Sequence, residues 1–174
     1  LHIHVTGGGG EQGPSSRVPE IRASELFLSG VTTLIGLLGT DGISRSLENL
    51  LFKCRALEEE GLTTFMLTGN YRYPSPTLTG DVERDIALID KIIGVKLAIS
   101  DHRGSGVTGE ELIRLGSEAR IGGMISGKPG IVVLHTGVSE TRLDPLFYAI
   151  EHSDVPCANF LPTHCCRTPA LVAD

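Results

Sequence analysis

Histidines and a lysine within an apolar segment are the residues of this chain whose types and spacing favour metal chemistry. His2 and His4 alternate with Leu1, Ile3 and Val5 in the opening segment. A β-strand directs alternate side chains to one face, so the two imidazoles would share a face and could hold one metal ion or a pair. Two imidazoles do not complete a metal site, so other segments must supply further ligands. The alternative is an ordinary strand that contains two histidines.

Lys96 is the unusual member of this set, because it lies inside the apolar segment Gly94–Ile99. Burial favours the neutral amine of a lysine. A neutral amine can add carbon dioxide and become a carbamate, an anionic group that can bridge two metal ions. The alternative is a lysine whose ammonium group reaches the rim of the fold along its flexible stem.

Other polar residues also follow apolar segments. His135 ends one such segment and His164 follows another, so four of the six histidines stand at segment ends. Imidazole is the commonest protein ligand for zinc and related metals. Further polar side chains stand in the loops beyond the segments: Glu11, Thr40, Tyr71, Arg103 and Arg167.

Six apolar segments alternate with segments of helical period. We expect strands over Leu1–Val5, Val31–Leu38, Leu62–Thr68, Gly94–Ile99, Ile131–His135 and Ala158–Thr163. We expect helices over 23–29, 46–60, 81–93, 108–121, 143–152 and 167–174. Asp81 is a candidate N-cap, and Thr108 with Glu111 forms a candidate capping box.

The strands recur about every 30 residues, the length of one βα unit. The fold class is therefore α/β, either an open doubly wound sheet or part of a (β/α)8 TIM-type barrel. Unbroken repetition favours the barrel, incomplete, with about six βα units and parallel strands. Barrel active sites are built at the carboxyl ends of the strands, where the polar residues stand.

The composition limits the partners. The 174 residues are 40% hydrophobic and 21% charged, which fits one partial barrel domain over 1–174, and the net charge of −6 predicts no nucleic-acid partner. No apolar run reaches the ~20 residues of a membrane span. The four cysteines lack a disulfide or zinc spacing, so we expect reduced thiols and a cytoplasmic protein. An opening Leu1 in place of methionine suggests a piece of a longer chain.

The order of these motifs along the chain resembles the amidohydrolase superfamily and, within it, the isoaspartyl dipeptidase family. The resemblance covers essentially the whole chain. It rests on His2-x-His4 followed by Gly7–Glu11, and on Leu38–Asp41, Met66–Gly69, Gly94–Lys96, Ala98–Arg103 and Leu161–His164.

The resemblance implies a binuclear zinc site and a dipeptide substrate. His2 and His4 would hold one zinc ion, His135 and His164 the other, and carbamylated Lys96 would bridge them together with a hydroxide. The implied substrate contacts are Tyr71 to the carbonyl oxygen, Glu11 to the amino group, and Thr40, Arg103 and Arg167 to the carboxylates. The implied reaction is hydrolysis of the amide between an aspartyl β-carboxyl group and the next residue.

The sequence also departs from that family. It lacks the N-terminal segment, the strand-eight aspartate that binds metal and acts as general base, and a nearby serine. We therefore expect a chain that lacks its proton-transfer group and has an unpaired edge at its sixth strand, prone to association. The full-length parent is expected to be a homo-oligomer. Cys165 and Cys166, beside a candidate ligand, are interpreted as buried small hydrophobes. The alternative is a pair of thiolates that compete for zinc.

Alternative functions remain open. One is a non-catalytic amidohydrolase-fold remnant or interaction protein, although retention of the candidate ligands favours the enzyme. Another is an amidohydrolase acting on a cyclic amide, although Glu11, Arg103 and Arg167 favour a zwitterionic dipeptide. The Gly8-x-Gly10-x-x-Gly13 pattern formally matches a dinucleotide fingerprint, but Pro14 follows it where a helix should open.

Overall fold

Six parallel strands form a single sheet in the computed structural model, which describes residues 1–174. The strands are β1 (His2–Ile3), β2 (Thr33–Gly36), β3 (Thr63–Gly69), β4 (Ile92–Ile99), β5 (Ile131–Thr136) and β6 (Phe160–Thr163). They lie in the order in which they occur along the chain. Each strand pairs in parallel with the next, so every connection is a crossover to the adjacent position.

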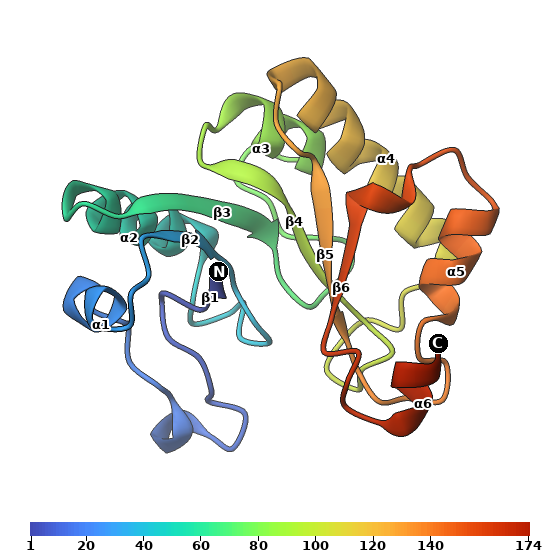
Figure 1. Ribbon diagram of the computed structural model, residues 1–174, viewed down its shortest axis with the longest axis horizontal. Helices are drawn as coiled ribbons and strands as arrows, with labels where there is room; N and C mark the ends of the chain where they lie inside the picture. Colours follow the sequence, from blue (N-terminus) through green and yellow to red (C-terminus); the bar gives the residue numbers. More distant parts are fainter.

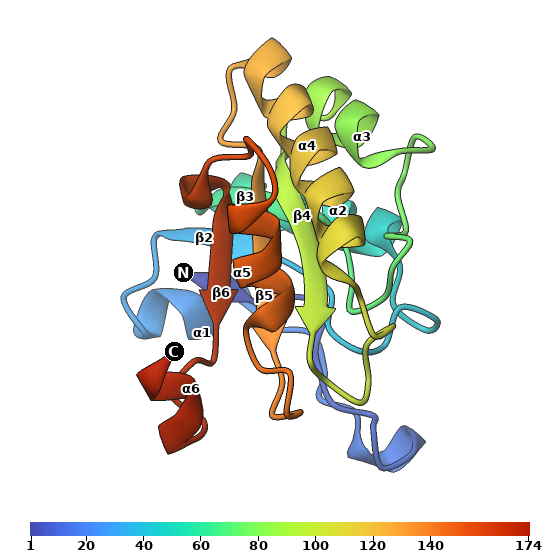
Figure 2. The ribbon, with the colours of Figure 1, turned by 90° about the vertical axis from the view of Figure 1, so that its right-hand side faces the viewer.

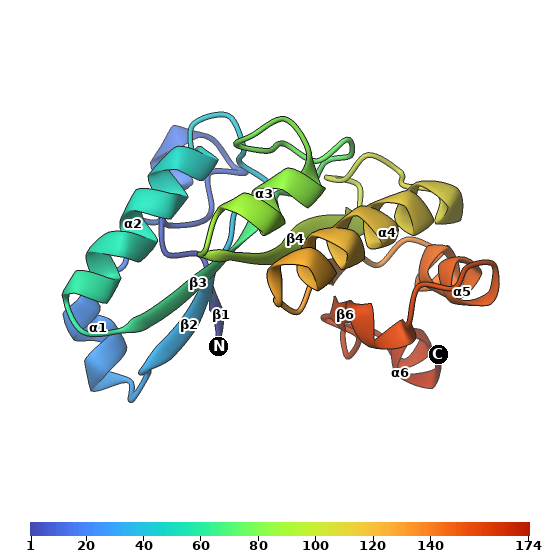
Figure 3. The same ribbon diagram turned by 90° about the horizontal axis from the view of Figure 1, so that it is seen from above.

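The helices cover the outer side of this curled sheet. They are α1 (Ala23–Leu28), α2 (Leu47–Glu59), α3 (Val82–Leu88), α4 (Gly109–Ser126), α5 (Asp144–Glu151) and α6 (Pro169–Ala173), with short 3-10 turns at η1 (Pro14–Ser16) and η2 (Cys157–Asn159). Figure 1 gives the arrangement, and Figure 3 shows the strands as an arch with α1 to α5 around it. The incomplete (β/α) barrel is therefore confirmed, and the doubly wound sheet is excluded because its strand order would double back.

Local sequence signals place the helix ends. The Asp81 side chain accepts a hydrogen bond from the Arg84 backbone at 2.6 Å and begins α3. Thr108 and Glu111 form the expected capping box at the start of α4.

Two helix boundaries differ from the expectation. The helix over 81–93 ends at Leu88, because Ile92 and Ile93 belong to β4. The helix over 108–121 continues to Ser126 through two glycines that the sequence suggests as breakers. A Cβ at Gly122 would lie 2.8 Å from the Glu83 carbonyl oxygen, so this glycine permits close packing of α4 on α3.

The first strand is shorter than expected. β1 contains only His2 and Ile3, and the chain turns where the Val5 amide donates to the Ile3 carbonyl at 3.0 Å. Val5 is fully buried, whereas Leu1 is 73% exposed and does not pack beneath a helix. His4 therefore stands just beyond the strand end.

Two apolar layers fix which side chains face the concave side of the sheet. The large outer core lies between sheet and helices and includes Val95 and Leu97 of β4. A small inner cluster consists of Leu37, Leu67, Ile93 and Val133. Since side chains alternate along a strand, Lys96 and His135 lie on the inner face with this cluster.

The carboxyl ends of the strands meet at one end of the molecule. In Figure 2 the arrowheads of β4 and β6 point to the same lower end, where the loops that carry the polar residues gather. No helix has both the length and the apolar character needed to cross a membrane.

Candidate active site

Lys96 lies at the centre of the candidate site. It is 1% exposed, and burial, with no acidic group to oppose it, lowers its pKa to about 8. Burial first, and then the charge on Lys96, lowers the pKa of His2 to about 4. The same two causes also lower the pKa of His4. The charge on Lys96 also contributes to the lowered pKa values of His135 and His164. The ring pairs His2–His4 and His135–His164, with His135 in register two residues beyond Lys96 on the neighbouring strand, place the histidines at the end of the sheet that carries this lysine.

The backbone beside Lys96 requires glycine. Lys96 is in register with Gly69 of β3 and Val133 of β5. Gly69 has φ of 78°, and a Cβ there would lie 2.5 Å from the Lys96 carbonyl oxygen. The end of β3 therefore fits against β4 only without a side chain.

The histidines form two pairs on either side of the half-barrel. The ring centroids of His2 and His4 are 6.4 Å apart, and those of His135 and His164 are 4.7 Å apart. The Nδ1 atom of His4 lies 3.2 Å from the Leu37 carbonyl oxygen, to which it can donate. That hydrogen bond leaves Nε2 with a free lone pair, the usual state of a metal-binding histidine.

The donor set is chemically suited to zinc but incomplete in its unmodified form. No three side chains of histidine, cysteine, aspartate or glutamate form a group able to bind one ion. Each histidine pair supplies two nitrogen donors, and zinc takes at least three protein ligands. A carbamate on buried Lys96 would supply a further donor to both pairs, so the residues fit the predicted zinc pair once Lys96 is modified.

Both ring nitrogens of His135 have close polar neighbours. The Tyr71 hydroxyl lies 2.6 Å from Nδ1, and an Asp101 carboxylate oxygen lies 2.9 Å from Nε2. A metal at His135 would have to replace one of these neighbours. Burial raises the pKa of Tyr71 to about 12, so the phenol stays protonated and can donate.

A glutamate and an arginine of opposite charge face each other beside His135. Arg103 donates from Nη1 to Glu11 Oε1 at 3.0 Å, and the Thr40 hydroxyl donates to the same oxygen at 2.6 Å. The hydrogen bond from Thr40, together with the nearby Arg103, lowers the pKa of Glu11. The Arg103 guanidinium also lies 5.4 Å from the centre of the Tyr71 ring.

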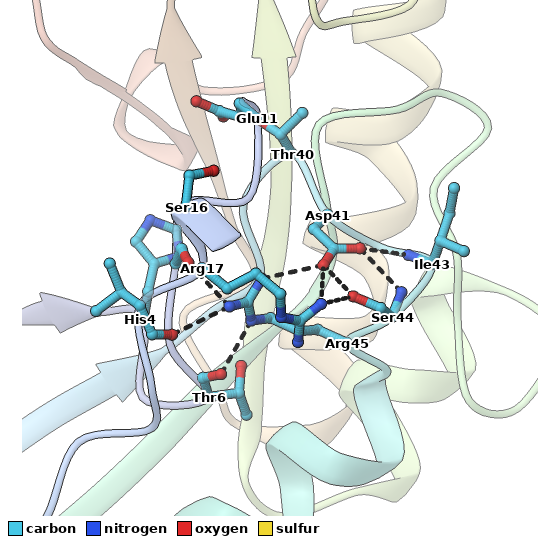
Figure 4. Close-up of polar contacts among 12 residues, drawn as sticks. His4, Thr6, Glu11, Ser16, Arg17, Thr40, Asp41, Ile43, Ser44 and Arg45 are labelled. Atoms are coloured by element: carbon cyan, nitrogen blue, oxygen red, sulfur yellow. Dashed lines mark hydrogen bonds and ion pairs between the residues drawn. The ribbon is translucent and has the colours of Figure 1, made fainter. Parts of the chain in front are cut away.

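The loop that carries Glu11 is held by an arginine that sequence reasoning missed. Arg45 is buried, and it donates to the carbonyl oxygens of Thr6 at 3.0 Å and Gly8 at 2.8 Å. It also donates to Asp41 Oδ2 at 3.0 Å, and Arg17 reaches the same oxygen at 3.2 Å (Figure 4). The cleft beside this network is lined by His4, Glu11, Thr40, Asp41, Arg45, Tyr71 and the glycines at 7, 8, 9 and 39.

The residues after β6 form an exposed part of the site. His164 and Arg167 are exposed, and Arg167 Nη1 lies 3.4 Å from His135 Nε2. The interpretation of Cys165 and Cys166 as buried is wrong, because Cys165 is partly exposed and Cys166 is exposed. No further strand covers this edge of the sheet.

Asp101 is the second residue that sequence reasoning missed. It stands in the Ala98–Arg103 motif, directly after β4, but nothing in the sequence distinguishes it from its neighbour His102. In the structure the His102 side chain is 86% exposed and that of Asp101 only 4% exposed. The one sequence signal that could have identified Asp101 is its position at a strand end among other site residues.

Comparison with solved structures places this arrangement in a known family. No family model matches the chain. A crystal structure of β-aspartyl dipeptidase from Fervidobacterium islandicum AW-1 matches with a TM-score of 0.96 and 53% identity over 99% of this chain and 47% of that chain. A second structure of that enzyme, in complex with β-Asp-Leu dipeptide, matches with the same TM-score and identity over 99% of this chain and 46% of that one.

The fold and the site define the chain as part of a (β/α)-barrel protein, with its polar residues at the carboxyl ends of the strands. The chain belongs to the β-aspartyl dipeptidase family, at 53% identity over nearly its whole length. It spans about half the length of those solved structures. The resemblance drawn from the sequence motifs is thereby confirmed.

Proposed function

We propose that this chain forms the metal-binding and much of the substrate-binding part of an enzyme that hydrolyses β-aspartyl dipeptides. The observation that carries this proposal is its 53% identity to a structure that holds β-Asp-Leu dipeptide. Its own residues add support, because buried Lys96 and four histidines stand at the strand ends beside a carboxylate and an arginine.

The Glu11–Arg103 pair suits a zwitterionic substrate. The two opposite charges contact each other at 3.0 Å. A β-aspartyl dipeptide carries a free ammonium group and free carboxylates, so it can replace this contact with one ion pair to each partner. Thr40 would hold the Glu11 carboxylate in place through the hydrogen bond from its hydroxyl. Arg167 would bind a second carboxylate of the substrate, since an arginine fork matches a carboxylate with two hydrogen bonds.

Zinc is the proposed metal, with His2 and His4 at one position, His135 and His164 at the other, and carbamylated Lys96 between them. When bound, a zinc pair lowers the pKa of water and polarises a carbonyl group. Tyr71, kept protonated by burial, would donate a hydrogen bond to the carbonyl oxygen as negative charge develops there. None of the described residues is assigned as the general base.

Two further assignments belong to this proposal. The four cysteines are free thiols, which suits the proposed cytoplasmic location. The runner-up function is a non-catalytic barrel protein, and the experiments below distinguish it from the enzyme.

The first experiment tests the substrate. The complete gene product that contains these residues should hydrolyse β-Asp-Leu and leave α-linked Asp-Leu intact. Glu11→Gln should lower kcat/KM for β-Asp-Leu about 100-fold, because a charge-assisted hydrogen bond to the ammonium group is lost. The matched control is Glu140→Gln, a change at an exposed residue, which should behave as wild type. Equal loss on substrates that lack the free amine would remove the role given to Glu11.

The second experiment tests the metal bridge. Metal analysis should find about two zinc ions per chain, the number a two-metal hydrolase requires. Lys96→Ala should lose both ions and activity, and acetate or propionate should restore part of each, because a free carboxylate can replace the carbamate. Lys53→Ala, at a lysine of α2 that pairs with Glu20, is the control. A fully active, metal-free Lys96→Ala protein would refute the site.

A further inference from the structure

Asp101 is the charged residue of the site to which the proposed function gives no role. Its Oδ1 accepts from Arg103 Nε at 2.9 Å, and its Oδ2 accepts from Arg103 Nη2 at 2.8 Å. The same Oδ2 lies 2.9 Å from His135 Nε2. One carboxylate, with its side chain 4% exposed, therefore contacts a proposed metal ligand and a proposed substrate-binding arginine.

The backbone around Asp101 holds it firmly against the end of β5. Ser100 has φ of 53°, in the left-handed region that non-glycine residues rarely adopt. The Ser139 amide donates to the Ser100 carbonyl at 3.0 Å. A Cβ at Gly137 would lie 2.1 Å from the Ser100 carbonyl oxygen and 2.5 Å from Asp101 Cα. The turn and the loop after His135 therefore pack backbone to backbone, and Asp101 keeps its place relative to His135.

The contacts also define the state of the His135 ring. Three groups lie near Nε2 of His135: the Asp101 carboxylate oxygen at 2.9 Å, Arg103 Nη2 at 3.2 Å and Arg167 Nη1 at 3.4 Å. The carboxylate only accepts hydrogen bonds and makes the shortest of these contacts, so we assign the hydrogen of Nε2 to the bond with Asp101. Nδ1 is then the acceptor, and the Tyr71 hydroxyl donates to it. Tyr71 makes no other hydrogen bond through its hydroxyl, whereas Asp101 is fixed by Arg103 as well. Of the two neighbours, Tyr71 is the one free to leave Nδ1 to a metal.

We propose that Asp101 is a positioning residue that couples His135 to Arg103, so that zinc binding at His135 and substrate-carboxylate binding at Arg103 strengthen each other. This inference rests on the proposed function. A carboxylate on the second nitrogen of a metal-binding histidine fixes its tautomer and raises its basicity. The same carboxylate aligns the guanidinium fork of Arg103 through two parallel hydrogen bonds. Coupling of this kind is reciprocal between the two ligands.

The first test uses the metal-free protein and does not depend on activity. Long-range proton–nitrogen NMR of the histidine rings should show His135 protonated at Nε2 and unprotonated at Nδ1. The signals of His135 are assigned by their loss in His135→Asn. In Asp101→Asn, this tautomer preference should weaken. A wild-type His135 protonated at Nδ1 would overturn the inference, whether or not the protein is a dipeptidase.

The second test measures both zinc affinity and the KM for substrate in the complete gene product. Asp101→Asn should lower zinc affinity, measured by chelator competition, by about 10- to 100-fold. At saturating zinc it should raise KM for β-Asp-Leu about 10-fold and change kcat by less than about threefold, because Asp101 does not touch the reacting atoms. Asp154→Asn, at an exposed aspartate before the amino end of β6 and so at the opposite end of the strand from His164, should leave zinc affinity and KM unchanged.

The outcomes separate the possibilities. A loss of zinc affinity alone, or a rise in KM alone, would overturn the coupling, and no change in either would overturn the positioning role. If Asp101→Asn fails to fold by circular dichroism, Asp101→Glu keeps the charge but displaces it and should show the same paired losses. Wild-type values in that variant would overturn the inference. A wild-type protein without zinc or activity would instead refute the proposed function.

Discussion

Arg45 shows how single residues hold the loop that carries Glu11. A buried guanidinium is costly unless its donors are satisfied. Arg45 satisfies them with the carbonyl oxygens of Thr6, Gly8 and Val18 and with the Asp41 carboxylate. A flexible glycine loop thus acquires fixed anchor points. The position of Glu11 therefore depends on an arginine distant from it in sequence.

Asp41 makes this anchoring dependent on pH. Burial raises the pKa of Asp41, but hydrogen bonds from Ser44 and Ile43 and the charge on Arg45 outweigh it and lower the pKa to about 2. An acid with a lowered folded-state pKa stabilises the fold above its unfolded pKa of about 4, and this contribution is lost as the pH falls toward the folded value.

Asp41→Asn should therefore lower the free energy of unfolding near pH 7 by about 1 kcal/mol, a value reduced for solvent screening of a partly exposed group. The deficit should shrink between about pH 4 and pH 2, because the wild-type carboxyl is protonated there. Urea unfolding at a series of pH values measures it, with Asp154→Asn as the control. A deficit that stays constant down to about pH 2.5 would contradict the assignment.

At the scale of elements, the loop after β3 is fixed by one buried aspartate. Asp85 of α3 accepts hydrogen bonds from the backbone amides of Leu78 at 2.9 Å and Thr79 at 2.7 Å, and from the hydroxyl of Thr68. These contacts tie the end of the loop to β3 and α3. Tyr71 lies in this loop, so the helix that follows it helps to place the phenol beside His135.

The elements themselves could be predicted because their signals are local. Apolar runs identified all six strands, and capping residues identified the starts of α3 and α4. The boundary at Ile92 and Ile93 could not be predicted, because apolar residues there suit a helix end and a strand start equally. The continuation of α4 through Gly122 and Gly123 depends on tight packing against neighbouring segments, which only the fold reveals.

The site could be predicted only where its residues stand at strand ends. His135 and Lys96 were identifiable because alternation and strand order place them on one face near one end. Asp101 and Arg45 were not, because the contacts that bring them into the site, to His135 and to the Thr6 carbonyl, are with residues distant in sequence. His135 is 34 residues from Asp101, and Thr6 is 39 residues from Arg45. Such contacts carry no local pattern.

At the scale of the whole molecule, the half-barrel has two open edges. β1 pairs only with β2, and β6 pairs only with β5. A strand edge presents unpaired amide and carbonyl groups that can pair with another chain. Leu161 of β6 adds an apolar side chain that is 51% exposed at this edge. In the matching β-aspartyl dipeptidase structures, this chain corresponds to about half of the molecule.

We therefore expect the isolated chain of residues 1–174 to self-associate as its concentration rises into the range of about 10 to 100 μM, where exposed edges begin to pair. Sedimentation velocity measures this. Leu161→Lys should reduce the association without unfolding the chain, because a charged side chain on an edge strand opposes pairing and this position is already exposed. Phe147→Lys, at a 39% exposed position on helix α5 and so outside the sheet, is the matched control and should associate like wild type. A chain that stays monomeric throughout, or equal association in both variants, would show that the edges of β1 and β6 do not drive assembly.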